Sequence, residues 1–162
     1  MDLAWLFPWL LFLHVLGAIV AFGPTFTFSF IGAAGGAEPQ HANFATRLSH
    51  TLSSRLVIPI GITLPITGLA IIAVRQINPF ARPFWWLALA IVLYLIAYGY
   101  GFFVQRKLVE RVIEITSSPP PSGASGPPPE LMALVKRIQR GGMGMGILIV
   151  TIVLLMVVKP QI

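Results

Sequence analysis

The sequence predicts an all-α fold, a transmembrane four-helix bundle that forms a single integral membrane domain over residues 1–162. The main observation is four long stretches without any Asp, Glu, Lys or Arg, namely residues 3–37, 56–74, 83–104 and 141–158. Each is close to or longer than the roughly 20 apolar residues that carry a helix across about 30 Å of hydrocarbon. A mean hydropathy of +0.85 with 10% charged residues would also leave a soluble domain short of polar surface.

The first span is expected at about residues 5–33 and the third at about residues 83–104. Tryptophan pairs open both spans: Trp5 with Trp9, and Trp85 with Trp86. Amphipathic rings prefer the headgroup level of a bilayer, so these pairs are expected to mark the same membrane surface.

The second span, at about residues 54–74, is predicted to follow a short amphipathic helix over residues 43–55. Inside it, Pro59 and Pro65 cannot donate to the carbonyl groups four residues earlier, those of Arg55 and Gly61. Each freed oxygen needs a partner within the membrane, which span threonines, a neighbouring helix or a trapped water could supply. A ligand or ion path along a kinked span is the functional alternative.

The fourth span, at about residues 141–158, begins with GGMGMG. Gly142 and Gly146 predict a GxxxG seam for close helix packing, with Met143 and Met145 filling gaps beside it. Thioethers also suit Cu(I). On a helix, however, residues i and i+2 point to different faces, so packing is the preferred interpretation.

The longest loop, residues 116–129, contains six prolines and is expected to be an extended connector. Apolar residues repeat at helical spacing on both sides of it, over residues 108–113 and 131–138. Spans three and four are therefore expected to continue beyond the membrane as a helical hairpin. The hairpin either packs on itself, which we favour, or docks a soluble partner.

Lysine and arginine are retained on the cytoplasmic side of membrane proteins during insertion, so their placement predicts orientation. The side that holds the first and third loops carries eight of them: Arg47, Arg55, Arg106, Lys107, Arg111, Lys136, Arg137 and Arg140. The other side carries three: Arg75, Arg82 and Lys159. Both termini are therefore expected outside, and the hairpin of spans three and four in the cytoplasm. The net charge of +6 is explained by this asymmetry, and no nucleic-acid partner is expected.

His14 lies in the middle of the first span, in FLHVLGAIVAFG. An ionisable group at that depth is costly, which makes it a candidate functional residue. Gly17 and other small residues share its helical face, so another helix or a flat ligand can come close and the imidazole is expected to face the bundle. At 1.5 Å per residue, Tyr94, Thr63, Thr67 and Thr151 lie at about the same depth. The sequence therefore predicts a polar layer near the midplane.

Three functions of this layer stay open. A neutral His14 could hold helices together by hydrogen bonds, ligate haem iron, or take part in proton movement. For the second function the candidate cofactor is haem, with His14 as the metal ligand and Gly17, Tyr94, Thr63 and Thr67 lining the site. A second haem ligand within the chain is not expected: His50 lies outside span two, up to about 20 Å from this level, and His41 lies in the first loop.

No catalytic motif is found, and no Asp or Glu lies within a span. The absence of cysteine excludes disulfides and thiolate metal sites. We therefore lean against an enzyme.

The histidine in LHVLGA, with Gly17 and Gly23 after it and three further spans, resembles bacterial predicted integral membrane proteins of unknown function. These are similar in turn to the copper resistance protein D superfamily and to the membrane protoporphyrinogen oxidase, which binds haem b. In the oxidase, a histidine of the first helix works with an intramembrane lysine. The resemblance implies that His14 corresponds to that histidine. No lysine lies inside a span here, so oxidase activity is not expected to carry over.

Together these features predict a multi-pass protein of the inner cell membrane that acts as a non-catalytic subunit or a small-ligand-binding module. A structural accessory subunit and an oxidase-like enzyme are the alternatives. The expected partners are the lipid bilayer and either further copies of the chain or the subunits of a larger membrane complex.

Overall fold

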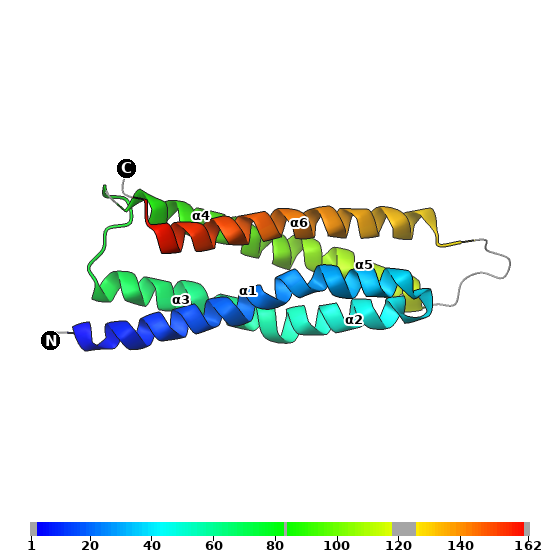
Figure 1. Cartoon of the computed structure of the whole chain (residues 1–162), viewed down its shortest axis with the longest axis horizontal. Helices are drawn as coiled ribbons and strands as arrows, with labels where there is room; N and C mark the ends of the chain where they lie inside the picture. The colour runs from blue at the N-terminus through cyan, green and yellow to red at the C-terminus, as the bar shows by residue number, and fades with distance from the viewer. Residues whose placement is uncertain (1–2, 83, 118–125, 161–162) are drawn as a thin grey trace.

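The computed structural model describes residues 3–82, 84–117 and 126–160. This part of the chain contains helices and no strand, and its helices form four long rods that lie side by side (Figure 1). All four rods are long and apolar enough to cross a membrane. The predicted all-α transmembrane bundle is confirmed.

The rods follow one another along the chain. The first rod is α1 (Phe7–Ala37), and the fourth is α6 (Pro129–Val158). The second rod consists of α2 (Ala42–Leu52), a π-helical segment η3 (Ser53–Val57) and α3 (Ile58–Val74). The third rod consists of α4 (Trp85–Tyr100), a π-helical segment η4 (Gly101–Gln105) and α5 (Arg106–Ser117). The expected amphipathic helix before span two is α2, and it runs into α3 without a break. The expected extensions of spans three and four are α5 and the first part of α6. Residues 118–125, most of the predicted connector, lie outside the described residues.

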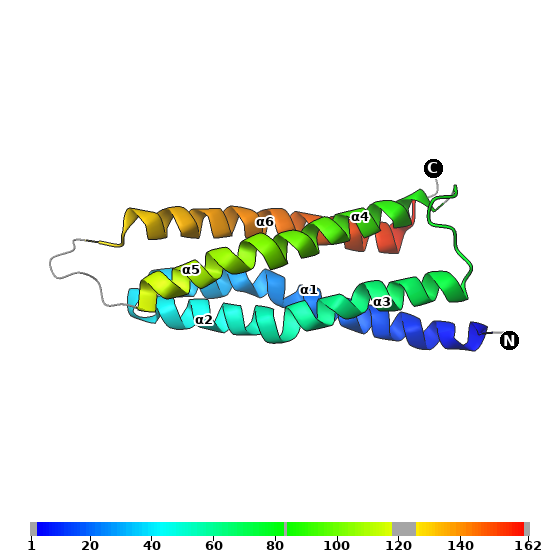
Figure 2. The ribbon, with the colours of Figure 1, turned by 180° about the vertical axis from the view of Figure 1, so that it is seen from behind.

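The four rods pack in antiparallel pairs. α1 lies against α2 and α3, and α6 lies against α4 and α5 (Figures 1 and 2). We call the end of the bundle where α1 meets α2 the hairpin end, and the opposite end, where both chain termini lie in Figure 1, the terminal end. A cluster of Trp86, Leu87, Ala90 and Leu155 is buried between α4 and α6 towards the terminal end.

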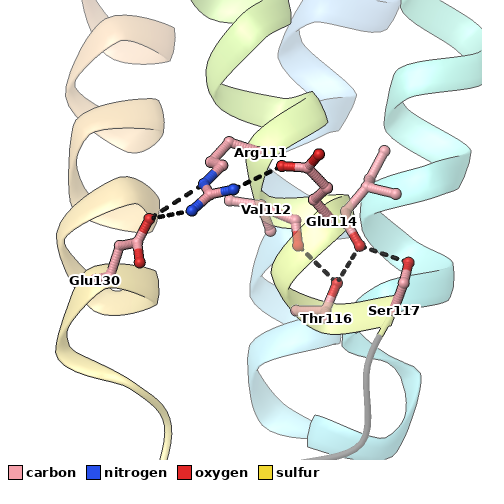
Figure 3. A network of polar contacts seen from close by, with 7 residues as sticks. Arg111, Val112, Glu114, Thr116, Ser117 and Glu130 are labelled. Atoms are coloured by element: carbon pink, nitrogen blue, oxygen red, sulfur yellow. Dashed lines mark hydrogen bonds and ion pairs between the residues drawn. The ribbon is translucent and has the colours of Figure 1, made fainter.

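Polar contacts join the rods at the hairpin end. Asn43 of α2 donates to the Thr116 hydroxyl of α5 at 2.8 Å. The Arg111 guanidinium of α5 pairs with Glu114 at 2.7 Å and with Glu130 of α6 at 3.1 Å (Figure 3). Hydrogen bonds to Glu114 and Glu130 raise the pKa of Arg111 above its usual value. These contacts fix α5 against both of its neighbours.

The glycines of α6 pack differently from the prediction. A Cβ at Gly142 would meet nothing within 4 Å, and one at Gly146 would only touch Phe26 at 4.0 Å, so the expected GxxxG seam is wrong. The close approach is at Gly141, where a Cβ would collide with the Tyr100 hydroxyl. Met145 reaches the π-helical segment at Gly101, as expected of a gap filler, whereas Met143 is 67% exposed. The correct seam is one residue earlier because Tyr100 and Gln105 occupy the face of α4 and η4 that meets α6.

Candidate functional site

His14 projects from α1 towards α3 and is half-buried. Its Nδ1 lies 2.8 Å from the Thr67 Oγ1 of α3. The polar edge of the ring therefore faces α3.

The hydrogen bonds around Thr67 indicate which ring nitrogen carries the proton. The Thr67 Oγ1 lies 2.9 Å from the Thr63 carbonyl and 3.1 Å from the Leu64 carbonyl, so its single hydrogen is directed to its own helix. Its lone pairs then accept from an Nδ1–H of His14. We assign this tautomer from the network. It leaves Nε2 as a bare nitrogen, and no hydrogen bond to Nε2 is found among residues 3–82, 84–117 and 126–160.

Two glycines let α1 and α3 come this close. A Cβ at Gly17 would lie 3.3 Å from Leu64 Cδ2 and 3.5 Å from Thr63 Oγ1. A Cβ at Gly68 would lie 3.3 Å from His14 Cε1. The small-residue face of α1 thus packs against a helix, which is one of the two possibilities expected for it. No space for a flat ligand is left between Gly17 and α3.

Tyr94 belongs to a second polar unit. Its hydroxyl donates to the Gly61 carbonyl of α3 at 2.5 Å, and this is the oxygen that Pro65 cannot use. Tyr98, stacked on Tyr94 with ring centroids 5.8 Å apart, donates to the Ile58 carbonyl at 3.2 Å. A neighbouring helix therefore supplies the partner that the freed carbonyl needs.

The predicted layer is divided rather than continuous. His14, Gly17, Thr63 and Thr67 meet at the α1–α3 seam, but Thr63 donates to the Ile60 carbonyl of its own helix at 2.7 Å. Thr151 likewise donates to the Ile147 carbonyl within α6 at 2.9 Å. Tyr94 lies near Phe22 of α1, with ring centroids 6.5 Å apart. Within the described ranges its hydroxyl bonds Gly61, whereas His14 bonds Thr67, and no hydrogen bond joins Tyr94 to His14. Depth along a helix placed these residues at similar levels but could not show which faces meet.

Arg75 belongs to the same seam and was not expected there. Its guanidinium lies over the Phe7 ring, 4.8 Å from the centroid, at the terminal end of α1 and α3. Phe7 is seven residues before His14, and Arg75 is eight residues after Thr67, so each pair shares one helical face. The sequence signal for this placement is that spacing, which is separate from the charge asymmetry that predicts orientation.

The remaining histidines lie elsewhere. His41 is exposed, 3.6 Å from Glu38, and His50 lies on α2 towards the hairpin end. Within the described ranges, no group of three or more His, Cys, Asp or Glu side chains is arranged to hold a metal ion.

A family model described as predicted integral membrane protein (DUF2269) matches residues 8–160, and the chain belongs to this family. No curated protein and no solved structure matched the chain. The chain is therefore an integral membrane protein with several spans, from a family of unknown function. No match supports the wider resemblance to copper resistance protein D and protoporphyrinogen oxidase, which stays a prediction.

Proposed function

We propose that this member of the family is a non-catalytic membrane module that binds haem b through the Nε2 of His14. The observation that supports the proposal is the Nδ1 of His14, 2.8 Å from Thr67 Oγ1. In the tautomer that we assign, Nε2 carries no hydrogen. Histidines that ligate metals hold their other ring nitrogen in this way, because the second hydrogen bond fixes both tautomer and orientation. Bound haem would supply one-electron redox chemistry.

The residues present fit one axial ligand and an apolar setting. His14 is half-buried at the α1–α3 seam, where the side chains of both helices are mostly apolar. Arg75, eight residues from Thr67 and hence about 12 Å along α3, would supply a cation for the carboxylates of a bound haem. In this arrangement Gly17 and Thr63 serve helix packing, and Tyr94 serves the α3–α4 contact rather than the haem.

A structural clasp is the second candidate function, and the close packing at Gly17 and Gly68 favours it. In that case the His14–Thr67 hydrogen bond holds α1 to α3 and Nε2 has no ligand. Such interhelical bonds contribute about 0.6 kcal/mol each in membrane proteins. The two functions share Thr67 and differ only at Nε2.

The test is titration of the detergent-purified protein with haemin, followed by absorption spectroscopy. The proposal predicts a shifted Soret band with one haem per chain, which is lost in His14→Ala and retained in His50→Ala and His41→Ala as matched controls. Thr67→Val should keep the band with affinity lowered about 10- to 100-fold, as measured for the partners of metal-bound histidines. A wild-type protein that binds no haem, or a His14→Ala variant with the wild-type spectrum, would contradict it.

Stability measurements separate the clasp from haem binding. A clasp alone predicts a colourless protein in which His14→Ala lowers the free energy of unfolding by about 0.6 kcal/mol. In the haem module, the same substitution also abolishes the extra stability that added haem gives to the wild type.

A further inference from the structure

The Lys and Arg side chains of the hairpin end differ in whether they already have a partner. Arg47 donates to the Ser117 hydroxyl at 3.3 Å. Arg106 pairs with Glu110, and Arg111 pairs with Glu114 and Glu130, so these three carboxylates are already engaged. Five further cations have no ion pair or hydrogen bond within the described parts of the chain: Arg55, Lys107, Lys136, Arg137 and Arg140. All five are exposed. We call them the basic belt.

The basic belt lies at one depth on three rods. Arg55 is 19 residues before the end of α3 at Val74, Lys107 is 22 residues after the start of α4 at Trp85, and Lys136 to Arg140 are 22 to 18 residues before the end of α6. At about 1.5 Å per residue, these cations lie about 27 to 33 Å from the terminal end. This span matches the hydrocarbon thickness of about 30 Å.

The side chains on either side of the belt change character. Just towards the terminal end, the exposed residues are apolar, with Phe103 64%, Met143 67% and Ile147 69% exposed. Towards the hairpin end follow the carboxylates Glu110, Glu114 and Glu130. Exposed apolar side chains also continue past the belt, with Phe44 67% and Met132 50% exposed. The belt therefore marks the depth at which the charge-free stretches of the last three rods end.

The belt extends over three of the four rods rather than covering one face, and α1 carries none of its residues. At the hairpin end the helices contact one another in the closed order α1, α2, α5, α6. Lys107 lies on α5, and Lys136, Arg137 and Arg140 lie on α6. Arg55 lies on η3, the π-helical segment that directly follows α2. A single soluble partner would meet only one of these faces, whereas a bilayer surface meets all of them.

We propose that the basic belt binds the phosphate groups of anionic phospholipids in the leaflet at the hairpin end. Long Lys and Arg side chains can extend along the apolar surface and place their charges among the headgroups. Each contributes about fivefold to the partition towards an anionic membrane surface. The belt thereby fixes the depth of the bundle, and with it the depth of His14, independently of any haem.

Retention of lipid by the purified protein tests the proposal. Wild type would be equilibrated in mixed micelles of phosphatidylglycerol and phosphatidylcholine, and bound lipid counted by native mass spectrometry. We expect a preference for phosphatidylglycerol that falls about tenfold or more in Lys107→Gln/Arg140→Gln. The matched control Arg82→Gln/Lys159→Gln removes the same two residue types at the terminal end and should keep the preference.

Two further arms make the result decisive. Lys107→Arg/Arg140→Lys preserves the charges and should restore the preference, which separates lost binding from damaged folding. Inorganic phosphate at millimolar concentration should not displace the lipid, since the site needs the headgroup together with its acyl chains. Equal phosphatidylglycerol preference in the belt and control variants would overturn the proposal, and so would displacement by inorganic phosphate.

Discussion

Tyr94 replaces a backbone donor that proline removes from α3. Pro65 has no N–H, and the Gly61 carbonyl it would have bonded accepts the Tyr94 hydroxyl instead, at 2.5 Å. The sequence predicted that this oxygen needs a partner, because an unsatisfied carbonyl inside a bilayer is costly. It did not predict Tyr94 as the donor, since periodicity gives the depth of a residue on its helix but not the angle at which two helices meet.

Substitution of Tyr94 tests this replacement. We expect Tyr94→Phe to lower the free energy of unfolding by about 0.6 kcal/mol. In a Pro65→Ala background the cost should shrink, because the N–H of residue 65 can then bond the Gly61 carbonyl. A double-mutant cycle followed by unfolding in SDS measures this coupling. Tyr98→Phe is the control, because its acceptor, the Ile58 carbonyl, is four residues before Ile62 in α3 and Ile62 has a backbone N–H. The Pro65→Ala background should therefore not change the cost of Tyr98→Phe. Equal Tyr94→Phe costs in both backgrounds would exclude the replacement.

Gly61 of α3 packs against the tyrosines of α4. A Cβ there would lie 2.8 Å from Tyr98 Cε2, so we expect Gly61→Ala to destabilise the protein by about 1–3 kcal/mol. Gly99→Ala is the control, because its Cβ would meet nothing within 4 Å and alanine favours helix by about 1 kcal/mol. In thermal unfolding in detergent, the melting temperature of Gly61→Ala should lie below that of the wild type, and that of Gly99→Ala should lie above it. Matching melting temperatures would refute the close approach.

At the scale of the helical elements, the two π-helical segments occupy equivalent positions. η3 (Ser53–Val57) ends 17 residues before Val74, and η4 (Gly101–Gln105) begins 16 residues after Trp85, so both lie about 25 Å from the terminal end. A π-helical turn accommodates an additional residue and changes the face that the following helix presents. Nothing in composition or periodicity indicated these segments, although the amphipathic stripes correctly predicted the helices after them.

The π-helical segment in the third rod should set the face that α5 turns to α2. Deleting Val104 should convert η4 to regular helix and rotate α5 by about 100° relative to α4. The contact between Asn43 and Thr116, 2.8 Å in the intact chain, would then be lost. The chain has no cysteine, so Asn43→Cys/Thr116→Cys can be cross-linked with a short bismaleimide without background. We expect cross-linking at full length and none after deletion, and persistent cross-linking would contradict this role of η4.

At the scale of the whole molecule, the number of spans followed from the charge-free stretches alone. A helix satisfies its own backbone in lipid, so a long apolar stretch is enough to predict a span. The packing order could not be predicted in the same way, because α1, α3 and α4 are apolar on every side and hydrophobicity does not mark the face that meets a neighbour. Gly17 and Gly61 mark those faces, because neighbouring helices pack closely against them. Near these glycines, His14 bonds Thr67 and Tyr94 bonds the Gly61 carbonyl.

Orientation is a prediction for the whole molecule that labelling can test. The excess of Lys and Arg at the hairpin end predicts that this end is cytoplasmic. A membrane-impermeant maleimide added to intact cells should label Asn78→Cys, in the loop before α4, and should label Ser117→Cys only after permeabilisation. The reverse pattern would place both termini in the cytoplasm.

The proposed function depends on which nitrogen of the His14 ring is protonated. Nitrogen-15 NMR of the bilayer-reconstituted protein, with isotope-labelled histidine and with His41 and His50 replaced by glutamine, reports which ring nitrogen is protonated. We predict a protonated Nδ1 and a bare Nε2 without haem, and loss of this single tautomer in Thr67→Val. A spectrum with the proton on Nε2 would contradict the claim that Thr67 prepares His14 as a ligand.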